Sequence, residues 1–165
     1  MAGMLRPLWR AATSGLCRRV VSGPEYAARM RASGTFTVAD FTPAPVPGPQ
    51  IDTAVPVGVS TMEKRFDGEV AGRSTTLFTA AFDESTAVGT YVAMESFDGA
   101  LHGRTGRFNF AHAATTLGDG GRAGEFFVVV PGSGTGDLAG ITGGGGVAVE
   151  ADGTHRIWFD YELGR

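Results

Sequence analysis

The sequence predicts an all-β protein in which residues 31–165 form a single antiparallel, eight-stranded β-barrel. Three observations support this prediction. Apolar and polar residues alternate along most of this region, and no stretch shows the sustained three- and four-residue spacing of an amphipathic helix. Glycine-rich turns separate the alternating segments. A Gly-x-aliphatic-x-Gly pattern also recurs, as expected where a sheet must bend until its edges meet.

The expected strands follow one another at short intervals. The first covers residues 35–38, after which four prolines at every second position from Pro43 to Pro49 favour an extended connection outside any ladder. A turn is expected at residues 118–121, and Pro131 ends the sixth strand. The seventh strand is expected to combine residues 138–141 with 146–150, and Asp152-Gly153 then turns into the eighth. The remaining strands are expected at residues 57–66, 73–82, 90–97, 107–115, 123–130 and 155–163.

The repeated glycine pattern favours a barrel over a sandwich. It occurs within residues 66–74, again within 97–105, and as a shorter echo at 136–140. Glycine weakens a strand unless it forms a bulge, a bend or a close backbone approach. Two copies alone could be similar hairpin turns in a sandwich, and the third copy favours a closed barrel. We therefore predict structural roles for Gly68, Gly72, Gly99, Gly103, Gly134, Gly136 and Gly140.

Charge is distributed unevenly along the chain. Residues 1–31 hold six arginines and one acidic residue, whereas residues 32–165 hold 8 basic and 16 acidic side chains. We expect residues 1–30 to be a basic, disordered extension, or to reflect a start assigned upstream of Met30. A targeting or nucleic-acid-binding arm is the alternative. The acidic remainder argues against nucleic acid as a partner, because affinity for it comes mostly from neutralising phosphates.

Several kinds of site are not expected. No apolar run approaches the roughly 18 residues of a membrane-spanning helix, so we expect a cytoplasmic protein with no membrane partner. One cysteine excludes an intramolecular disulfide framework, and the three histidines lack metal-site spacing, so no metal is expected. The glycines at residues 132–136 precede no helix and no Gly-Lys-Ser/Thr, so no nucleotide or other cofactor is expected.

The segment PGSGTGDLAGITG spans residues 131–143. It resembles the signature of an uncharacterised bacterial family, domain of unknown function 3224 (DUF3224), as do residues 32–38, 64–68 and 152–163. The resemblance covers about residues 30–163. It implies a lipocalin-like barrel similar to allene oxide cyclase and, more distantly, to dirigent proteins, which cyclise or couple apolar ligands in a cavity. The cyclase's catalytic residues have no matching positions here, so the resemblance implies a fold and no active site.

Two residues could form an acid/base pair inside the barrel. If Arg104-Thr105 is a two-residue hairpin loop, Phe97 faces His112 and Glu95 lies diagonally across from His112 on the same face. A carboxylate and an imidazole in an apolar interior could serve in catalysis. The alternative places Glu95 at the rim and His112 in the core. Alternation also points to ligand-binding candidates: Tyr91, Phe108, Phe110, His155, Phe159 and Tyr161.

Three functions are therefore considered. The first is binding of a small apolar or aromatic molecule in the barrel, which suits the size of an eight-stranded barrel. The second is an isomerase or cyclase that uses Glu95 and His112. The third is a structural or oligomerisation module with a filled barrel. The sixth strand is apolar on both faces, with Phe126 and Val128 on one and Phe127 and Val129 on the other, so we expect a homo-oligomer whose subunit interface covers one face.

Overall fold

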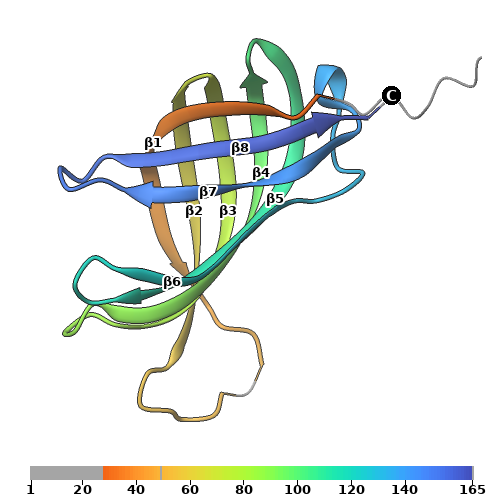
Figure 1. Ribbon diagram of the computed structural model, residues 1–165. Coiled ribbons are helices and arrows are strands. Elements are labelled where there is room, and N and C mark those ends of the chain that lie inside the picture. The colour runs from red at the N-terminus through yellow and green to blue at the C-terminus, as the bar shows by residue number, and fades with distance from the viewer. Residues whose placement is uncertain (1–27, 49, 165) are drawn as a thin grey trace, which may run out of the picture.

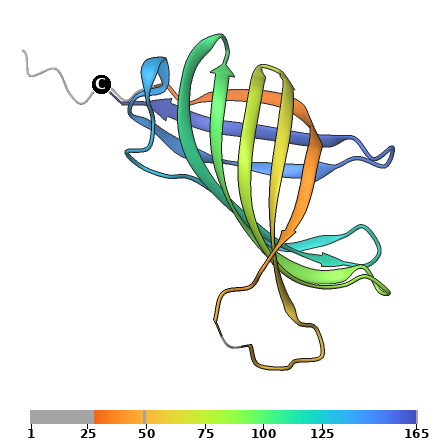
Figure 2. The same ribbon diagram turned by 180° about the vertical axis from the view of Figure 1, so that it is seen from behind.

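The computed structural model describes residues 28–48 and 50–164 (Figures 1 and 2). It confirms an all-β, antiparallel barrel. The expectations for residues 1–27, including the extension and the targeting arm, lie outside the described residues. No helix in the described ranges is long and apolar enough to cross a membrane. The elements are β1 (Met30–Ala44), β2 (Val57–Gly68), β3 (Val70–Asp83), β4 (Val88–Leu101), β5 (Arg104–Leu117), β6 (Arg122–Val129), the 3-10 helix η1 (Gly136–Leu138), β7 (Ile141–Val149) and β8 (His155–Leu163).

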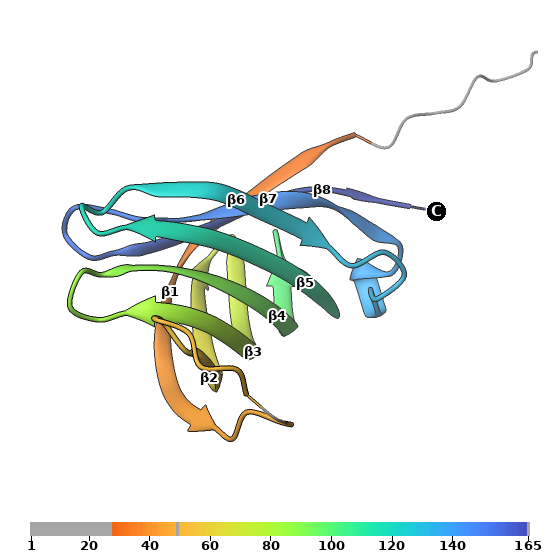
Figure 3. The ribbon, with the colours of Figure 1, turned by 90° about the horizontal axis from the view of Figure 1, so that it is seen from below.

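The strands form one sheet that curls almost into a closed barrel. Their order is β6-β5-β4-β3-β2-β1-β8-β7, so β6 and β7 are the two edges. Among the described residues these edges share no ladder, yet β6 runs alongside β7 in Figure 3. A Cβ placed on Gly144 of β7 would lie 3.2 Å from the carbonyl oxygen of Phe127 of β6. We call this unpaired contact between β6 and β7 the seam.

The β4–β5 hairpin differs from its expected register. Leu101 pairs with Arg104, so the loop is His102-Gly103, and the expected Arg104-Thr105 loop is wrong. Both loop residues have positive φ, 49° at His102 and 78° at Gly103, which suits a two-residue turn between twisted strands. Phe97 consequently faces Phe108 rather than His112.

The seventh strand is also not the expected one. β7 runs without interruption from Ile141 to Val149, through four consecutive glycines, whereas Leu138 belongs to η1. The glycines leave room for β8: a Cβ on Gly146 would overlap the indole ring of Trp158. The third copy of the glycine pattern is therefore a turn around η1 rather than a bend in a strand, with a φ of 60° at Gly136.

The first strand is longer than expected because a bulge and a proline are accommodated in it. The register of β1 against β2 shifts between Val38 and Asp40, which leaves Ala39 as an extra residue. β1 continues through Pro43, which pairs with Ser60, so the expected exclusion of this proline from the ladder is wrong. Beyond the bulge, Phe41 pairs with Met62 and stays on the inner face. Residues 45–48 and 50–56 then lie outside the strands and extend past the lower end of the barrel in Figure 1.

The interior has three levels along the barrel. The end that carries η1 is filled with a core that includes Phe36, Phe66, Phe97, Phe108, Phe110, Phe159 and Tyr161, and fully buried Leu138 of η1 belongs to it. Buried polar side chains occupy the middle level: Lys64, Ser74, Thr76, Glu95 and His112. The opposite end, near residues 45–48 and 50–56, is open. We call these levels the closed end, the polar layer and the mouth.

The two faces of β6 are both apolar, as the sequence indicates. Val129 is buried and Phe127 packs against the core, whereas Phe126 is 54% exposed on the outer face. Within this single chain nothing described covers Phe126, and the expected subunit contact stays a prediction.

Candidate functional site

Glu95 is the centre of the polar layer. The side chain of this β4 residue is buried and its two oxygens are shared among three donors from three other strands. Lys64 of β2 donates to Oε1, and Nε2 of His112 of β5 lies 2.7 Å from the same oxygen. The hydroxyl of Ser74 of β3 donates to Oε2 at 2.6 Å. The hydrogen bonds among Glu95, Lys64, Ser74 and His112 offset part of the cost of burying these polar groups, whereas the buried hydroxyl of Thr76 has no hydrogen-bond partner in the described part of the chain.

The charge of Glu95 is stabilised by these partners. Burial raises the pKa of this carboxyl, but the hydrogen bond from His112, the charge and hydrogen bond of Lys64, and the hydroxyl of Ser74 outweigh it. Together they lower the pKa from 4.5 to about 2, so Glu95 is ionised at neutral pH. The Lys64 ammonium also lies 5.0 Å from the centre of the Phe36 ring, where the π face attracts a cation.

The network continues from His112 toward the seam. Nδ1 of His112 lies 3.1 Å from the hydroxyl of Tyr91, which in turn accepts a hydrogen bond of 2.8 Å from Arg122 of β6. Arg122 also donates to Glu125 at 2.6 Å. Five ionisable side chains thus connect the buried centre of the barrel with the exposed Glu125.

A small cavity of about 80 Å³ lies at the seam, and we call it the side pocket. Glycines of β7 and Trp158 of β8 form one wall, and residues of β4, β5 and β6 form the other. Tyr91, His112 and Arg122 all line it. Because the seam has no ladder, the polar network meets the surface here.

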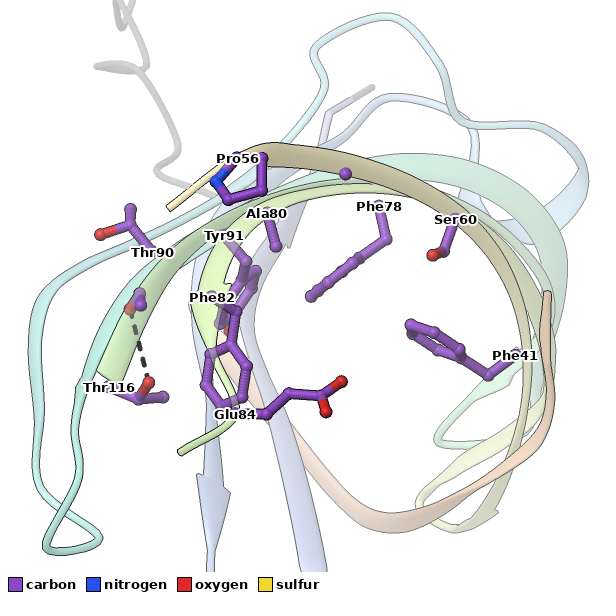
Figure 4. Close-up of a pocket in the computed structure, with 12 residues that line it drawn as sticks. Phe41, Pro56, Ser60, Phe78, Ala80, Phe82, Glu84, Thr90, Tyr91 and Thr116 are labelled. Carbon is purple, nitrogen blue, oxygen red and sulfur yellow. Dashed lines mark hydrogen bonds between the residues drawn. The ribbon is translucent and has the colours of Figure 1, made fainter. Parts of the chain in front are cut away.

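A larger cavity of about 470 Å³ occupies the mouth, and we call it the mouth pocket (Figure 4). Phe41 and Phe78 project into its opening, and their ring centres are 6.1 Å apart. Phe78 also stacks on Tyr91, with 5.2 Å between ring centres and 22° between planes. The lining is mostly apolar and includes Phe41, Ser60, Phe78, Ala80, Phe82 and Tyr91.

The structure separates the residues that the sequence singled out. Glu95 and His112 are in contact with each other and both are buried, so the rim position considered for Glu95 is wrong, whereas His112 lies hydrogen-bonded in the interior as that alternative has it. Tyr91 alone of the six ligand-binding candidates lines the mouth pocket. His155 packs on Phe36 with 5.0 Å between ring centres. The other four candidates pack in the core of the closed end: Phe108, Phe110, Phe159 and Tyr161.

Sequence reasoning missed much of the mouth pocket and three members of the polar layer, Lys64, Ser74 and Thr76. Phe78 and Phe82 follow the alternation of the third expected strand and could have been found from it. Phe41 could not, because the bulge at Ala39 breaks the alternation that starts at Phe36. Glu63 and Lys64 are neighbours on the second expected strand, and alternation alone does not say which of the two charges points inward.

The predicted structural glycines occupy tight positions, except Gly103, where a Cβ would meet nothing within 4 Å and the positive φ of 78° favours glycine instead. Gly72 and Gly99 pair across β3 and β4, and a Cβ on Gly99 would lie 2.1 Å from the carbonyl oxygen of Ala71. In the described ranges, no three His, Cys, Asp or Glu side chains are placed to hold a metal ion.

Comparison with known protein families shows to which family the chain belongs. A family model described as "Protein of unknown function (DUF3224)" matches residues 32–161. The chain belongs to this family. A crystal structure of a DUF3224 protein of unknown function from Shewanella oneidensis MR-1 is similar to it, with 29% identity and a TM-score of 0.72. The similarity covers 84% of this chain and 99% of that chain. Comparison with curated proteins found no match.

Membership of DUF3224 agrees with the resemblance of residues 131–143. The match begins at residue 32, close to the start of β1 at Met30. The further likeness to allene oxide cyclase and dirigent proteins stays a resemblance, and the site has to be interpreted from its own geometry.

Proposed function

We propose that this DUF3224 protein binds a small apolar or aromatic molecule in the mouth pocket. One observation above all supports this: an apolar cavity of about 470 Å³ opens at one end of a barrel whose other end is packed with aromatic side chains. Cavities of this size and lining are typical of small-molecule sites. Two aromatic rings at the opening, Phe41 and Phe82, are 52% and 45% exposed. A bound apolar ligand would remove them from water.

The same observation weighs against a barrel that serves only as a filled structural module. Side chains fill the closed end, whereas the aromatic rings of the mouth line an open space of about 470 Å³. Phe78 and Tyr91 are stacked and half-buried, so one wall of the pocket is ordered before any ligand arrives. A preformed wall lowers the entropy that binding must overcome.

The alternative function is an isomerase or cyclase that acts on such a ligand. The specific observation that favours it is the 2.7 Å contact between His112 Nε2 and Glu95 Oε1, which is within the reach required of an acid/base pair. Because Glu95 is buried beneath the mouth pocket, any proton exchange with a ligand needs another group that reaches the cavity wall.

Binding can be tested with the neutral aromatic fluorophore phenylnaphthylamine. Phe78→Ala removes a ring from the pocket wall and should weaken the affinity by about tenfold, as expected for the loss of one aromatic contact. Leu77→Ala is the matched control, because the neighbouring side chain points outward and is 64% exposed. Equal affinities in the two variants would contradict the proposal. Mass spectrometry of small molecules that co-purify with the protein would then identify the natural ligand.

A further inference from the structure

Tyr91 is the residue at which the two cavities meet. Its ring lines the mouth pocket and stacks on Phe78. Its hydroxyl contacts His112 and Arg122, which both line the side pocket. No other residue of the polar network lines both cavities.

The hydrogen-bond partners fix the direction in which each proton points. Ionised Glu95 can only accept hydrogen bonds, so Nε2 of His112 carries the hydrogen that it donates to Oε1. In a neutral imidazole Nδ1 is then the acceptor, and the hydroxyl of Tyr91 donates to it. Arg122 can only donate, and it donates to the oxygen of Tyr91. The order carboxylate, imidazole, phenol is that of a nucleophile activated by an oriented base.

We propose that Tyr91 is the catalytic residue of this site, the group that exchanges a proton with the bound molecule. His112 accepts the hydroxyl proton of Tyr91, and Glu95 positions His112. The proposal rests on the proposed function, since it requires a ligand in the mouth pocket. The contact between Glu95 and His112 alone gives Tyr91 no role in proton transfer, and this proposal does.

The relay fits an apolar β,γ-unsaturated carbonyl compound, in which the C–H bond that breaks lies between the carbonyl and a carbon–carbon double bond, so that the enolate extends over that double bond. The proton of that bond passes to the oxygen of Tyr91 while the hydroxyl proton of Tyr91 passes to Nδ1 of His112. The electron pair of the broken C–H bond moves into the enolate, and the imidazolium is paired with Glu95. Return of the proton at another carbon gives an isomer and restores every group, so no oxidant or reductant is needed. The positive charge of Arg122 favours negative charge on the oxygen of Tyr91 during transfer.

A second set of the same groups provides an internal control. Tyr161 lies 3.2 Å from Nδ1 of His102, whose Nε2 lies 3.6 Å from Glu69. Tyr161 is fully buried in the core of the closed end and lines neither the mouth pocket nor the side pocket. The two tyrosines therefore differ in their access to a cavity, and Tyr91 additionally accepts a hydrogen bond from Arg122 and has the closer carboxylate–imidazole pair behind it.

The probe for this relay is benzenesulfonyl fluoride, a small aromatic electrophile. The oxygen of Tyr91 attacks sulfur, the S–F bond breaks, fluoride leaves, and the hydroxyl proton passes to His112. Peptide mass spectrometry should find the benzenesulfonyl group on Tyr91 and not on Tyr161. His112→Gln should slow the labelling by about tenfold or more. His102→Gln, the matched control, should leave the rate unchanged.

Affinity for phenylnaphthylamine is measured on the same variants. A slower rate in His112→Gln with unchanged affinity supports a role in proton transfer, because a merely structural role would alter both. Folded wild-type protein that is not labelled on Tyr91, or is labelled equally in His112→Gln, would overturn the relay. If His112→Gln does not fold, the site of labelling in the wild-type protein still decides whether Tyr91 is the reactive tyrosine. Failure of the wild-type protein to bind phenylnaphthylamine would count against the proposed function, independently of the labelling result.

Discussion

His112 Nε2 lies 2.7 Å from Glu95 Oε1, although neither residue is the other's partner in the β4–β5 ladder. Ala93 faces His112 and Phe110 faces Glu95, so the two are diagonal neighbours on the inner face. Long side chains reach each other at such positions. The small side chain of Ala93 leaves the imidazole free to turn toward the carboxylate. The curvature of the barrel brings Lys64 of β2, which lies two strands away from Glu95 in the sheet, to the same carboxylate oxygen.

The first prediction concerns stability in acid. Because the folded-state pKa of Glu95 is about 2 and its ordinary value is 4.5, its contribution to stability is fully present above about pH 4.5. That contribution is lost as the pH falls from 4.5 toward 2, and the shift corresponds to a loss on the order of 3 kcal/mol. Urea unfolding at a series of pH values should show the loss. A free energy of unfolding that stays constant over this range would contradict it.

The second prediction separates the two charges of the buried ion pair. Glu95→Gln leaves the Lys64 ammonium buried without a carboxylate, and it should cost about 3–5 kcal/mol. Lys64→Met should cost less, because Glu95 keeps its hydrogen bonds from His112 and Ser74.

The double variant Lys64→Met/Glu95→Gln completes the cycle. It should be more stable than the sum of the two single losses by about 1 kcal/mol or more, since neither charge is then left alone. It should also lose less stability in acid than the wild type. Purely additive losses would show that Lys64 and Glu95 do not stabilise each other.

The architecture could be predicted from the sequence because it depends on local patterns. The two-residue alternation in His155–Leu163 is enough to place Phe159 and Tyr161 inside the barrel, whatever the neighbouring strands do. The closeness of Glu95 and His112 was also predicted, but from a register that was wrong. Both residues lie on the inner face in either register, and the shift moved His112 from one diagonal of Glu95 to the other.

The features that sequence patterns miss are those that depend on distant contacts. A bulge at Ala39 is stabilised by pairing with β2 and leaves no local signal. The choice between Glu63 and Lys64 as the inward charge is settled by Glu95, 31 residues away from Lys64. Glycines 143–146 would be poor strand formers by propensity, but at positions 143, 145 and 146 a Cβ would overlap the β8 backbone or the ring of Trp158.

The third prediction tests the glycine turn at η1. Gly136→Val places a β-branched residue at a φ of 60°, with its Cβ 2.8 Å from the carbonyl oxygen of Thr105. We expect a loss of about 2–4 kcal/mol in the free energy of unfolding, from combined strain and overlap. Gly58→Ala is the control, because its Cβ would meet nothing closer than 3.9 Å. Thermal melts of the two variants that coincide would refute a structural need for glycine at position 136.

The last prediction concerns Leu138, the side chain by which η1 covers the closed end. Leu138 is fully buried in the aromatic core, so Leu138→Ala should leave a cavity and cost about 2–5 kcal/mol. Leu117→Ala, at a leucine that is 49% exposed on β5, should cost less than about 1 kcal/mol. The mouth pocket lies at the other end of the barrel, so the affinity of folded Leu138→Ala for phenylnaphthylamine should match that of the wild type. A variant that keeps its stability but loses the fluorophore would show that the two ends of the barrel do not act independently.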